Sequence, residues 1–568
     1  MGGPAPPSVG LPRFWKAGPV SDQRTVGTVM LEMLADNGVD AAFGLPGVHN
    51  LAFWSTEAPI RIVGVRHEQA AVYAADGYGR ATGRLGVAFS TTGPGAANGL
   101  AAFGEATVSS SPVLFVASDV ATSLRDPEGP RGILHEMADQ AAPFAAFGVR
   151  AVTARSAQEA LDEVAGALAR AQQSPFRPSY LGVPSDILNS PWTGPAPSLP
   201  PSPSAVAPSG DDITAIVALV RACPQVVIWA GGGVAQCGVE GDAALTTLAE
   251  RLGAPVVTTY AGRGLMAGHP LSVQSSVHEP EIGGLIADAD LLIVVGSGFD
   301  AMNTKNWKMP LPERRVAIGL GDELPRTVTW DVLAKADALL TLRALGDELS
   351  DMDRPRSDRA ASLRSGVRAR VAADSRTAEA VSFVEAVETW PADGAIVTDM
   401  CIPGYWTSSH AVHPRPRRLI NPVGWGTLGF ALPAAIGPAA IGIRTLAVCG
   451  DGGPMFSLGE LATYVQERLP ITLVIVDDGG YGMLRFDQQV FGHDERGVDL
   501  VTPDWRLLAE SFGIPFAEIT DAAGLRAALA ESAQRSGPSM ILQRAAFYPP
   551  ASTSPRWFES PEGATEPA

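Results

Sequence analysis

The sequence predicts an α/β protein with three consecutive domains, each built on a parallel β-sheet. Its 568 residues amount to three or four domains at roughly 150 residues per domain. Short apolar runs, such as 113–117, 291–295 and 473–476, alternate with longer segments of helical character. Strands that are buried on both faces of a parallel sheet carry uninterrupted apolar runs. We therefore expect Rossmann-like or flavodoxin-like sheets.

Two stretches of unusual composition divide the chain. Residues 191–210 contain no charged side chain and many Pro and Ser residues, which is the composition of a linker. Residues 346–378 are rich in Arg and Asp and poor in large apolar side chains, which predicts an exposed helical connector. The expected organisation is a flexible segment at 1–20, domains at 21–190, 211–345 and 379–548, and a polar tail at 549–568.

Charge and cysteine content exclude several classes of protein. The chain carries 42 basic and 60 acidic residues, a net charge of −18. Phosphates would repel such a chain, so we expect neither a nucleic acid nor an anionic membrane as partner. The four cysteines, at 223, 237, 401 and 449, lack metal-ligand spacing. They favour a reducing, cytoplasmic location over a disulfide scaffold.

One charge-free stretch has the length of a membrane span. Residues 419–443 carry no charged side chain but eight Gly and Pro residues. These residues form poor helix and would leave backbone groups unpaired in lipid. We expect a buried, turn-rich segment there. The first twenty residues lack the apolar core of a signal peptide.

The sharpest chemical signal lies near the C-terminus, where two predicted strands each end in an acidic residue. The strand at 445–449 is followed by Gly450, Asp451, Gly452 and Gly453, then by a predicted helix at 458–468. The next strand, 471–476, is followed by Asp477, Asp478, Gly479, Gly480 and Tyr481. Ligands bind at the carboxyl edge of an open parallel sheet. Glycines allow close approach of the backbone, and two carboxylates there suit Mg²⁺ together with a diphosphate.

The spacing of these acidic residues resembles a known cofactor motif. A lone Gly-Asp-Gly arises by chance, but here a second acid follows at the next strand end, 27 positions after Asp451. The segment is similar to the thiamine-diphosphate motif of the acetolactate synthase and pyruvate decarboxylase superfamily, in which Gly-Asp-Gly precedes Asn-Asn. This chain differs in having Asp477-Asp478 in place of Asn-Asn.

The resemblance extends over almost the whole chain, with matching segments in the family's order. It implies thiamine-diphosphate-binding folds in the first and third domains, for the pyrimidine and the diphosphate respectively. Among subfamilies, residues 43–49, 134–136 and 139–140 most resemble 5-guanidino-2-oxopentanoate decarboxylases. The matching segments are 43–49, 66–68, 92–95 with Asn98, 179–186, 255–259 with 262–264, and 424–430.

The resemblance also assigns roles to single residues. Glu68 would hydrogen-bond the pyrimidine N1′ and so promote deprotonation of the thiazolium C2, acting as an indirect acid–base group. Leu428 would wedge between the two cofactor rings, and the carbonyl of Gly426 would hold the 4′-amino group. His49 and His135 would face the substrate as proton donors. The alternatives are a surface carboxylate for Glu68, core packing for Leu428 and structural histidines.

The same family pattern implies the metal ligands. Asp451, Asp478 and the carbonyl of Gly480 would bind Mg²⁺ together with two diphosphate oxygens and a water molecule. Asp478, the second residue of its pair, is the expected ligand. Asp477 would be solvated or would cap a backbone amide.

A dinucleotide-like pattern, Gly296 to Ala301, follows the strand at 291–295, with Asp322 after the next apolar run. The segment that should form its crossover helix, 302–312, contains two prolines and no apolar stripe, so we do not expect an NAD-dependent oxidoreductase. The family resemblance allows FAD in the middle domain, as in acetolactate synthases, although no residue here supports it.

The sequence is thus interpreted as a thiamine-diphosphate- and Mg²⁺-dependent 2-oxo acid decarboxylase or carboligase that resembles acetolactate synthase large subunits. One alternative is a simple 2-oxo acid decarboxylase that releases an aldehyde, of the 5-guanidino-2-oxopentanoate type. Another is a catalytically silent relative that serves as a binding subunit. The resemblance further implies a homodimer or homotetramer with active sites between subunits.

Overall fold

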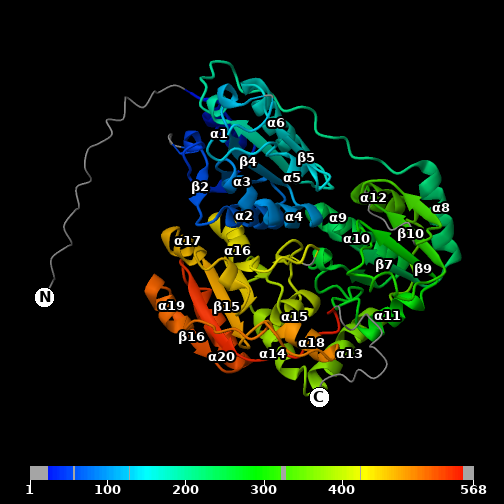
Figure 1. Ribbon diagram of the computed structural model, residues 1–568. Helices are drawn as coiled ribbons and strands as arrows, with labels where there is room; N and C mark the ends of the chain where they lie inside the picture. The colour runs from blue at the N-terminus through cyan, green and yellow to red at the C-terminus, as the bar shows by residue number, and fades with distance from the viewer. Residues whose placement is uncertain (1–23, 55–57, 127, 321–327, 423, 554–568) are drawn as a thin grey trace.

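Three parallel sheets, one per domain, organise the chain (Figure 1). The computed structural model describes residues 24–54, 58–126, 128–320, 328–422 and 424–553. The segment expected to be flexible, Asp322, and most of the expected polar tail lie outside the described residues. All pairs between named strands in the described chain are parallel, which confirms the predicted α/β class.

The N-terminal domain holds a six-stranded sheet in the order β2-β1-β3-β4-β6-β5. Its strands are β1 (Ala41–Gly44), β2 (Arg61–Gly64), β3 (Gly86–Ser90), β4 (Val113–Asp119), β5 (Arg150–Thr153) and β6 (Ser179–Pro184). Its helices are α1 (Val26–Asp36), η1 (Leu51–Phe53), α2 (Glu68–Thr82), α3 (Pro94–Asn98), α4 (Leu100–Val108), η2 (Thr122–Leu124), α5 (Ala142–Ala145), α6 (Ala157–Arg170) and α7 (Ser185–Leu188).

The middle domain holds a five-stranded sheet in the order β11-β10-β9-β7-β8. Its strands are β7 (Val226–Ala230), β8 (Val256–Thr258), β9 (Leu291–Val295), β10 (Arg314–Ile318) and β11 (Val332–Ala334). Its helices are α8 (Gly210–Ala222), α9 (Gly232–Gln236), α10 (Gly238–Leu252), η3 (Tyr260–Gly262), α11 (Pro280–Ala287) and α12 (Ala338–Glu348). Residues 302–308 form turns rather than a crossover helix.

The C-terminal domain repeats the strand order of the first, as β13-β12-β14-β15-β17-β16. Its strands are β12 (Ala395–Thr398), β13 (Leu419–Ile420), β14 (Thr445–Gly450), β15 (Ile471–Asp477), β16 (Phe516–Ile519) and β17 (Ser539–Arg544). Its helices are α14 (Ala378–Val387), α15 (Ile402–His410), α16 (Ala431–Ala440), η4 (Pro454–Phe456), α17 (Glu460–Gln466), α18 (Gly482–Val490), α19 (Trp505–Phe512) and α20 (Ala522–Ser532). The helix predicted at 458–468 is therefore shorter at both ends.

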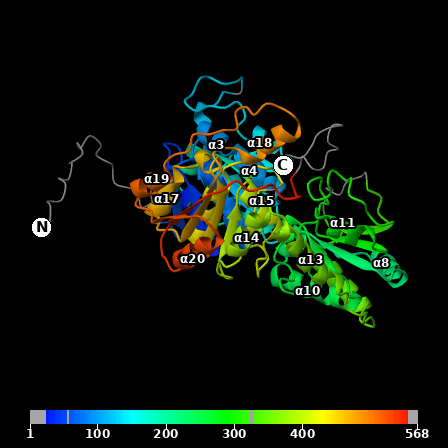
Figure 2. The same ribbon diagram turned by 90° about the horizontal axis from the view of Figure 1, so that it is seen from below.

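The connecting segments differ in character. Residues 192–209 have no regular structure and cross from the first domain to α8 (Figure 1). The second connection contains α13 (Arg359–Ala373), which contacts α11 of the middle domain and α14 of the last. Figure 2 shows α13 between those two domains. No helix in the described ranges has the length and apolar character that crossing a membrane requires.

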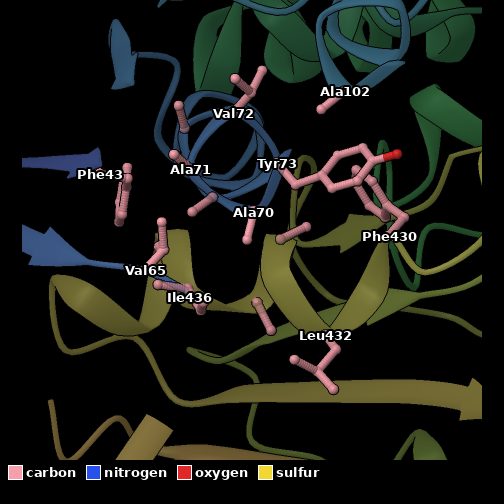
Figure 3. Packing of buried hydrophobic residues seen from close by; sticks show 14 of the residues in the cluster. Phe43, Val65, Ala70, Ala71, Val72, Tyr73, Ala102, Phe430, Leu432 and Ile436 are labelled. Atoms are coloured by element: carbon pink, nitrogen blue, oxygen red, sulfur yellow. The ribbon is translucent and has the colours of Figure 1, made fainter. Parts of the chain in front are cut away.

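Helices α2 and α16 join the first and third domains (Figure 3). Both are rich in Ala, and their facing side chains belong to one buried apolar cluster that contains Phe43, Tyr73, Phe430 and Ile436. The charge-free segment at 419–443 includes α16, whose residues are all buried in protein.

Two glycines set the distance between these helices. A Cβ on Gly77 of α2 would overlap the carbonyl of Ala434, and a Cβ on Gly437 of α16 would overlap the carbonyl of Ala74. The two helix backbones are thus so close that no residue other than glycine fits at positions 77 and 437, because only glycine lacks a Cβ.

We expect Gly77→Ala to destabilise the protein by about 1–3 kcal/mol, because the new methyl group must push the two helices apart. The measurement is the urea midpoint of the unfolding transition. Gly283→Ala is the matched control: this glycine of α11 has open space at its Cβ position, so the change should stabilise by about 0.4–1 kcal/mol. Equal midpoints for the two variants would contradict the close helix contact.

Candidate functional site

Three aspartates meet at the carboxyl edge of the C-terminal sheet. Strands β14 and β15 are neighbours, with Gly450 paired to Val476, so Asp451 and the pair Asp477-Asp478 leave the sheet side by side. Oδ2 of Asp451 and Oδ1 of Asp478 are buried, and neither has a hydrogen-bond partner in the described chain. Burying an unpaired carboxylate is costly, so two buried oxygens without partners are suited by their chemistry to a cation.

Electrostatics reinforces that interpretation. Burial, followed by the charges of Asp478 and Asp477, raises the pKa of Asp451 to about 7. Burial also raises the pKa of Asp478, which the Arg485 guanidinium partly offsets. A divalent cation between the two carboxylates would remove this repulsion. No cluster of three metal-ligating His, Cys, Asp or Glu groups occurs in the described ranges, so a metal here would need further oxygen ligands, such as those of a diphosphate.

Asp477 has a different environment from its neighbour. It is buried, and its carboxylate accepts hydrogen bonds from the Trp505 indole at 3.0 Å and the Arg544 guanidinium at 2.8 Å. Its Oδ1 also accepts from the amide of Gly479 at 3.1 Å. The expected backbone cap is present, whereas the expected solvation is wrong, because β17 and α19 cover this side chain.

The glycines of the motif form a close-packed floor. A Cβ on Gly450 would meet the Cβ of Cys401, one on Gly452 would overlap the ring of Tyr481, and one on Gly453 would overlap the carboxylate of Asp399. Tyr481 therefore lies against the first loop. Gly480 pairs with Asp499 in an isolated bridge, which fixes the second loop.

Asp399, which the sequence analysis overlooked, organises the adjacent turn. It follows β12 and is buried, and its oxygens accept from the amides of Gly429 at 3.0 Å and Ala431 at 3.4 Å. Burial raises its pKa to about 6, which these amides partly offset. The turn contains Gly426, with φ of 80°, and the partly exposed Leu428. An acid directly after a strand was the signal that could have revealed it.

Glu68 occupies a second cluster, in the N-terminal domain. Strand β2 ends at Gly64, and Glu68 is the first residue of α2. Its Oε2 accepts from the Asn98 amide at 3.0 Å. Gly95 lies close enough that an added Cβ would contact Oε1. The side chain is buried, so it is not a surface carboxylate.

His49 and His135 come from separate loops and form an edge-to-face pair, with ring centroids 5.5 Å apart. Nδ1 of each ring is buried without a hydrogen-bond partner among the described residues. Burial and the neighbouring His135 lower the pKa of His49. The loop of His135 is held by Glu136, whose carboxylate accepts the amides at 131–133.

Glu460, also overlooked in the sequence analysis, ties the two clusters to one framework. This buried residue of α17 accepts from the amides of Arg66 at 2.8 Å and His67 at 3.1 Å, directly before Glu68. Its other oxygen accepts from the Thr463 hydroxyl at 2.6 Å. The C-terminal domain thereby fixes the start of α2.

The two clusters remain separate within one chain. In the described ranges, the hydrogen bonds and ring contacts of Glu68, His49 and His135 go to residues of the N-terminal domain. Asp451 and Asp478 lie in the C-terminal domain. Each of these two clusters is called a half-site below.

A cavity of about 770 Å³ lies between the domains, next to the middle sheet. Its lining includes Gly232, Gly233, Ser297 and Gly298, at the carboxyl ends of β7 and β9. The strand order reverses between these two strands, which is where open sheets bind ligands. Gly231–Gly233, which open α9, are a glycine-rich turn that the sequence analysis did not consider.

Comparison with known proteins shows that the domains of both half-sites match TPP-binding domains. Residues 24–143 match the N-terminal TPP-binding domain of thiamine pyrophosphate enzymes, 213–345 their central domain and 401–542 their C-terminal TPP-binding domain. A probable 2-ketoarginine decarboxylase of Pseudomonas aeruginosa is 32% identical over 554 residues, covering 93% of this chain and 96% of its own.

Two acetolactate synthases are also similar. The large subunit from Parasynechococcus marenigrum is 29% identical over 90% of this chain and 86% of its own. The isozyme 2 large subunit of Escherichia coli is 27% identical, over 90% and 94%. The resemblance inferred from the motifs is therefore confirmed.

We expect Glu460→Ala to cost about 2–4 kcal/mol, because it leaves two buried backbone amides without an acceptor. Glu460→Gln should cost less, since the amide oxygen can still accept. Glu467→Ala is the matched control on the same segment, because its ion pair with Arg61 at 2.9 Å is partly solvated and worth about 0–1 kcal/mol. Urea unfolding measures the free energy of unfolding of all three variants. If Glu460→Ala loses no more stability than Glu467→Ala, the role of Glu460 in anchoring residues 66–67 is contradicted.

Proposed function

The chain belongs to the thiamine pyrophosphate-dependent enzymes, and on that premise we propose that it uses thiamine diphosphate and Mg²⁺ to decarboxylate a 2-oxo acid. One observation carries the proposal: two buried carboxylate oxygens, of Asp451 and Asp478, lack partners at adjacent strand ends. As an enzyme of this family, the chain is not interpreted as a silent binding subunit.

The residues of the C-terminal half-site fit the diphosphate and its metal. Asp451, Asp478 and the carbonyl of Gly480 would bind Mg²⁺, while Gly450, Gly452 and Gly453 let the backbone approach the diphosphate. Tyr481 would line that site. The extra charge of Asp478, where the family motif that this segment resembles has Asn, would favour the metal and oppose the diphosphate.

The other half-site fits the reactive end of the cofactor. Thiamine diphosphate supplies the electron sink for loss of CO₂. Glu68, already held by Asn98, would hydrogen-bond the pyrimidine N1′, and the carbonyl of Gly426 would accept from the 4′-amino group. Leu428, half-buried on the turn that Asp399 holds, would support the bent cofactor.

The histidine pair favours release of an aldehyde over joining to a second carbonyl compound. His49 and His135 present buried, unpaired ring nitrogens in the same domain as Glu68. A neutral imidazole can be protonated and then donate near neutral pH. The relative named as a probable 2-ketoarginine decarboxylase supports this choice.

Two chains would complete each active site. Large apolar side chains are exposed beside both half-sites: Val48 and Leu134 beside the histidines, with exposed fractions of 80% and 71%, and Met455 and Phe456 beyond Gly453, with 46% and 53%. Exposed apolar side chains gathered beside a site are characteristic of subunit interfaces. We therefore propose a homodimer, or a tetramer built from dimers, with sites between subunits.

The interdomain cavity supports a nucleotide-like ligand, and FAD is the candidate that the family offers. Its glycines at the ends of β7 and β9 would permit close approach of a diphosphate. Flavin would be recognised by its visible absorption in the supernatant of denatured protein.

We expect CO₂ release from 2-oxo acids that depends on added thiamine diphosphate and Mg²⁺, with one aldehyde formed per CO₂. Product analysis over pyruvate, longer aliphatic 2-oxo acids and 5-guanidino-2-oxopentanoate measures it. Acetolactate-type products in place of aldehydes would contradict the proposed product. Absence of cofactor-dependent CO₂ release from all of them would contradict the decarboxylase itself.

If Asp451 and Asp478 bind the metal, cofactor and Mg²⁺ should stabilise an Asn variant of Asp478 but not the Ala variants of either residue. Saturating thiamine diphosphate and Mg²⁺ at 100-fold above the dissociation constant should stabilise the parent by about 2.7 kcal/mol. Asp451→Ala and Asp478→Ala should lose this stabilisation, whereas Asp478→Asn keeps an oxygen ligand and should retain both stabilisation and activity. Without ligand, the two Ala variants should be at least as stable as the parent, because carboxylate repulsion is relieved. Cofactor binding by Asp478→Ala as tight as that of the parent would refute the metal site.

Mixing two inactive variants tests the shared site. Glu68→Gln should lower turnover by roughly 100-fold or more, and Asp451→Ala should abolish cofactor binding. After subunit exchange, about a quarter of the parental activity should return, because half of the dimers are mixed and each mixed dimer has one intact site. The control is Glu68→Gln mixed with itself. No recovery in subunits shown to exchange would place each site within one chain.

A further inference from the structure

Asp487 is an acidic side chain on an otherwise apolar helix face. It lies on α18, the first helix after the Asp478 loop, and shares its inward-facing side with Met483, Phe486 and Val490. Residues three and four apart lie on one face of a helix. Phe486 and Val490 are buried, and Met483 packs against the apolar core of this domain.

The carboxylate of Asp487 has no partner within the described ranges that would explain it. Its Oδ1 is buried and makes no hydrogen bond there, and no ion pair to Asp487 is found there. Burial raises its pKa to about 6, so it still carries a charge at neutral pH. A half-buried charge without a partner destabilises the free protein.

The nearest arginine in the sequence is engaged elsewhere. Arg485 ion-pairs with Asp499 at 2.9 Å and Glu495 at 3.8 Å, and lies 4.0 Å from Asp478. Its position two residues before Asp487 turns it to a different side of the helix. The protein therefore leaves the Asp487 charge for another cation.

The helix that carries Asp487 begins at the loop of Asp478, a residue of the proposed active site. Tyr405 of α15 is mostly buried, which raises its pKa, and the charges of Asp399 and Asp487 both add to that rise. Tyr405 thus lies within electrostatic reach of the turn that presents Leu428 and of Asp487. Gly482 packs directly against the Asp478 carboxylate, so α18 begins at the metal loop.

We propose that Asp487 binds a positively charged group, a guanidinium or an ammonium, at the far end of the side chain of the 2-oxo acid substrate. The inference rests on the proposed decarboxylase function and adds the class of substrate. A carboxylate forms charge-assisted hydrogen bonds with either group and pairs with both nitrogens of a guanidinium.

The position on the helix also indicates the length of the substrate. Asp487 lies five positions after Gly482, a rise of about 7.5 Å along the helix. A substrate whose 2-oxo group lies near the start of α18 would need several methylene groups to bring a cation to Asp487. The apolar side chains of α18 would line the path of that chain.

The test compares kcat/KM for 5-guanidino-2-oxopentanoate with that for 2-oxohexanoate, a neutral 2-oxo acid, in the cofactor-loaded enzyme. The parent should prefer the cationic substrate. In Asp487→Asn the ratio of the two values should fall roughly 10- to 100-fold, the usual effect of losing a charged hydrogen bond, and Asp487→Glu should restore part of it. Asp494→Asn is the matched control. The substitution also removes one negative charge nearby, but from an exposed side chain, so it should leave the ratio unchanged.

A binding measurement separates this inference from the proposed function. Calorimetry with 5-guanidinopentanoate, which has no 2-oxo group, should show binding to the parent, tighter than that of hexanoate and weakened in Asp487→Asn. Preference of the parent for the neutral acid, or an equal loss for both substrates in Asp487→Asn, would overturn the role of Asp487 while leaving a decarboxylase. Cation-selective binding without CO₂ release from any 2-oxo acid would support Asp487 and refute the decarboxylase.

Discussion

The close contact between α2 and α16 is the constraint on which the rest of the structure depends. Gly77 and Gly437 let the two backbones touch, and the apolar cluster around them joins the N- and C-terminal sheets into one core. Because packed interiors transmit small displacements, the separation of these helices sets where Glu68, at the start of α2, lies relative to the C-terminal domain. A methyl group at this contact would shift the first domain as a body.

The buried carboxylates divide into two groups by their partners. Asp399, Asp477 and Glu460 accept hydrogen bonds from backbone amides or side chains, and each of them holds a loop in place. Asp451, Asp478 and Asp487 each have a buried oxygen without a partner in the described chain. The first group holds the loops of the candidate site, and the second group offers buried oxygens that a ligand could pair with. This distinction, rather than residue type, separates structural acids from ligand-binding ones.

The first and third domains share one strand order but present different chemistry at their open edges. The third offers partnerless carboxylates and a glycine floor, which suit a metal and a diphosphate. The first offers a glutamate and two imidazoles, which suit proton transfer. Exposed apolar side chains accompany both half-sites, so association of two chains would bury these side chains and complete the site at once.

The sequence alone determined the class of fold, the family and the strand-end motif, because these depend on local patterns: apolar runs, glycine turns and an acid directly after a strand. The same reasoning located Asp451 and Asp478, since consecutive strands of a parallel sheet present their ends at one edge. The structure adds that Glu68 is the first residue of α2, which His67 caps.

Only the tertiary structure decided which acids have partners. The anchoring of Asp477 by Trp505 and Arg544 and of residues 66–67 by Glu460 joins positions far apart in the sequence. Asp487 is unpaired because folding surrounds it with apolar side chains of α18 and brings no donor within hydrogen-bond distance in the described chain. A sequence carries the charge of a carboxylate at its position, but whether that charge is neutralised depends on groups that folding brings within hydrogen-bond distance.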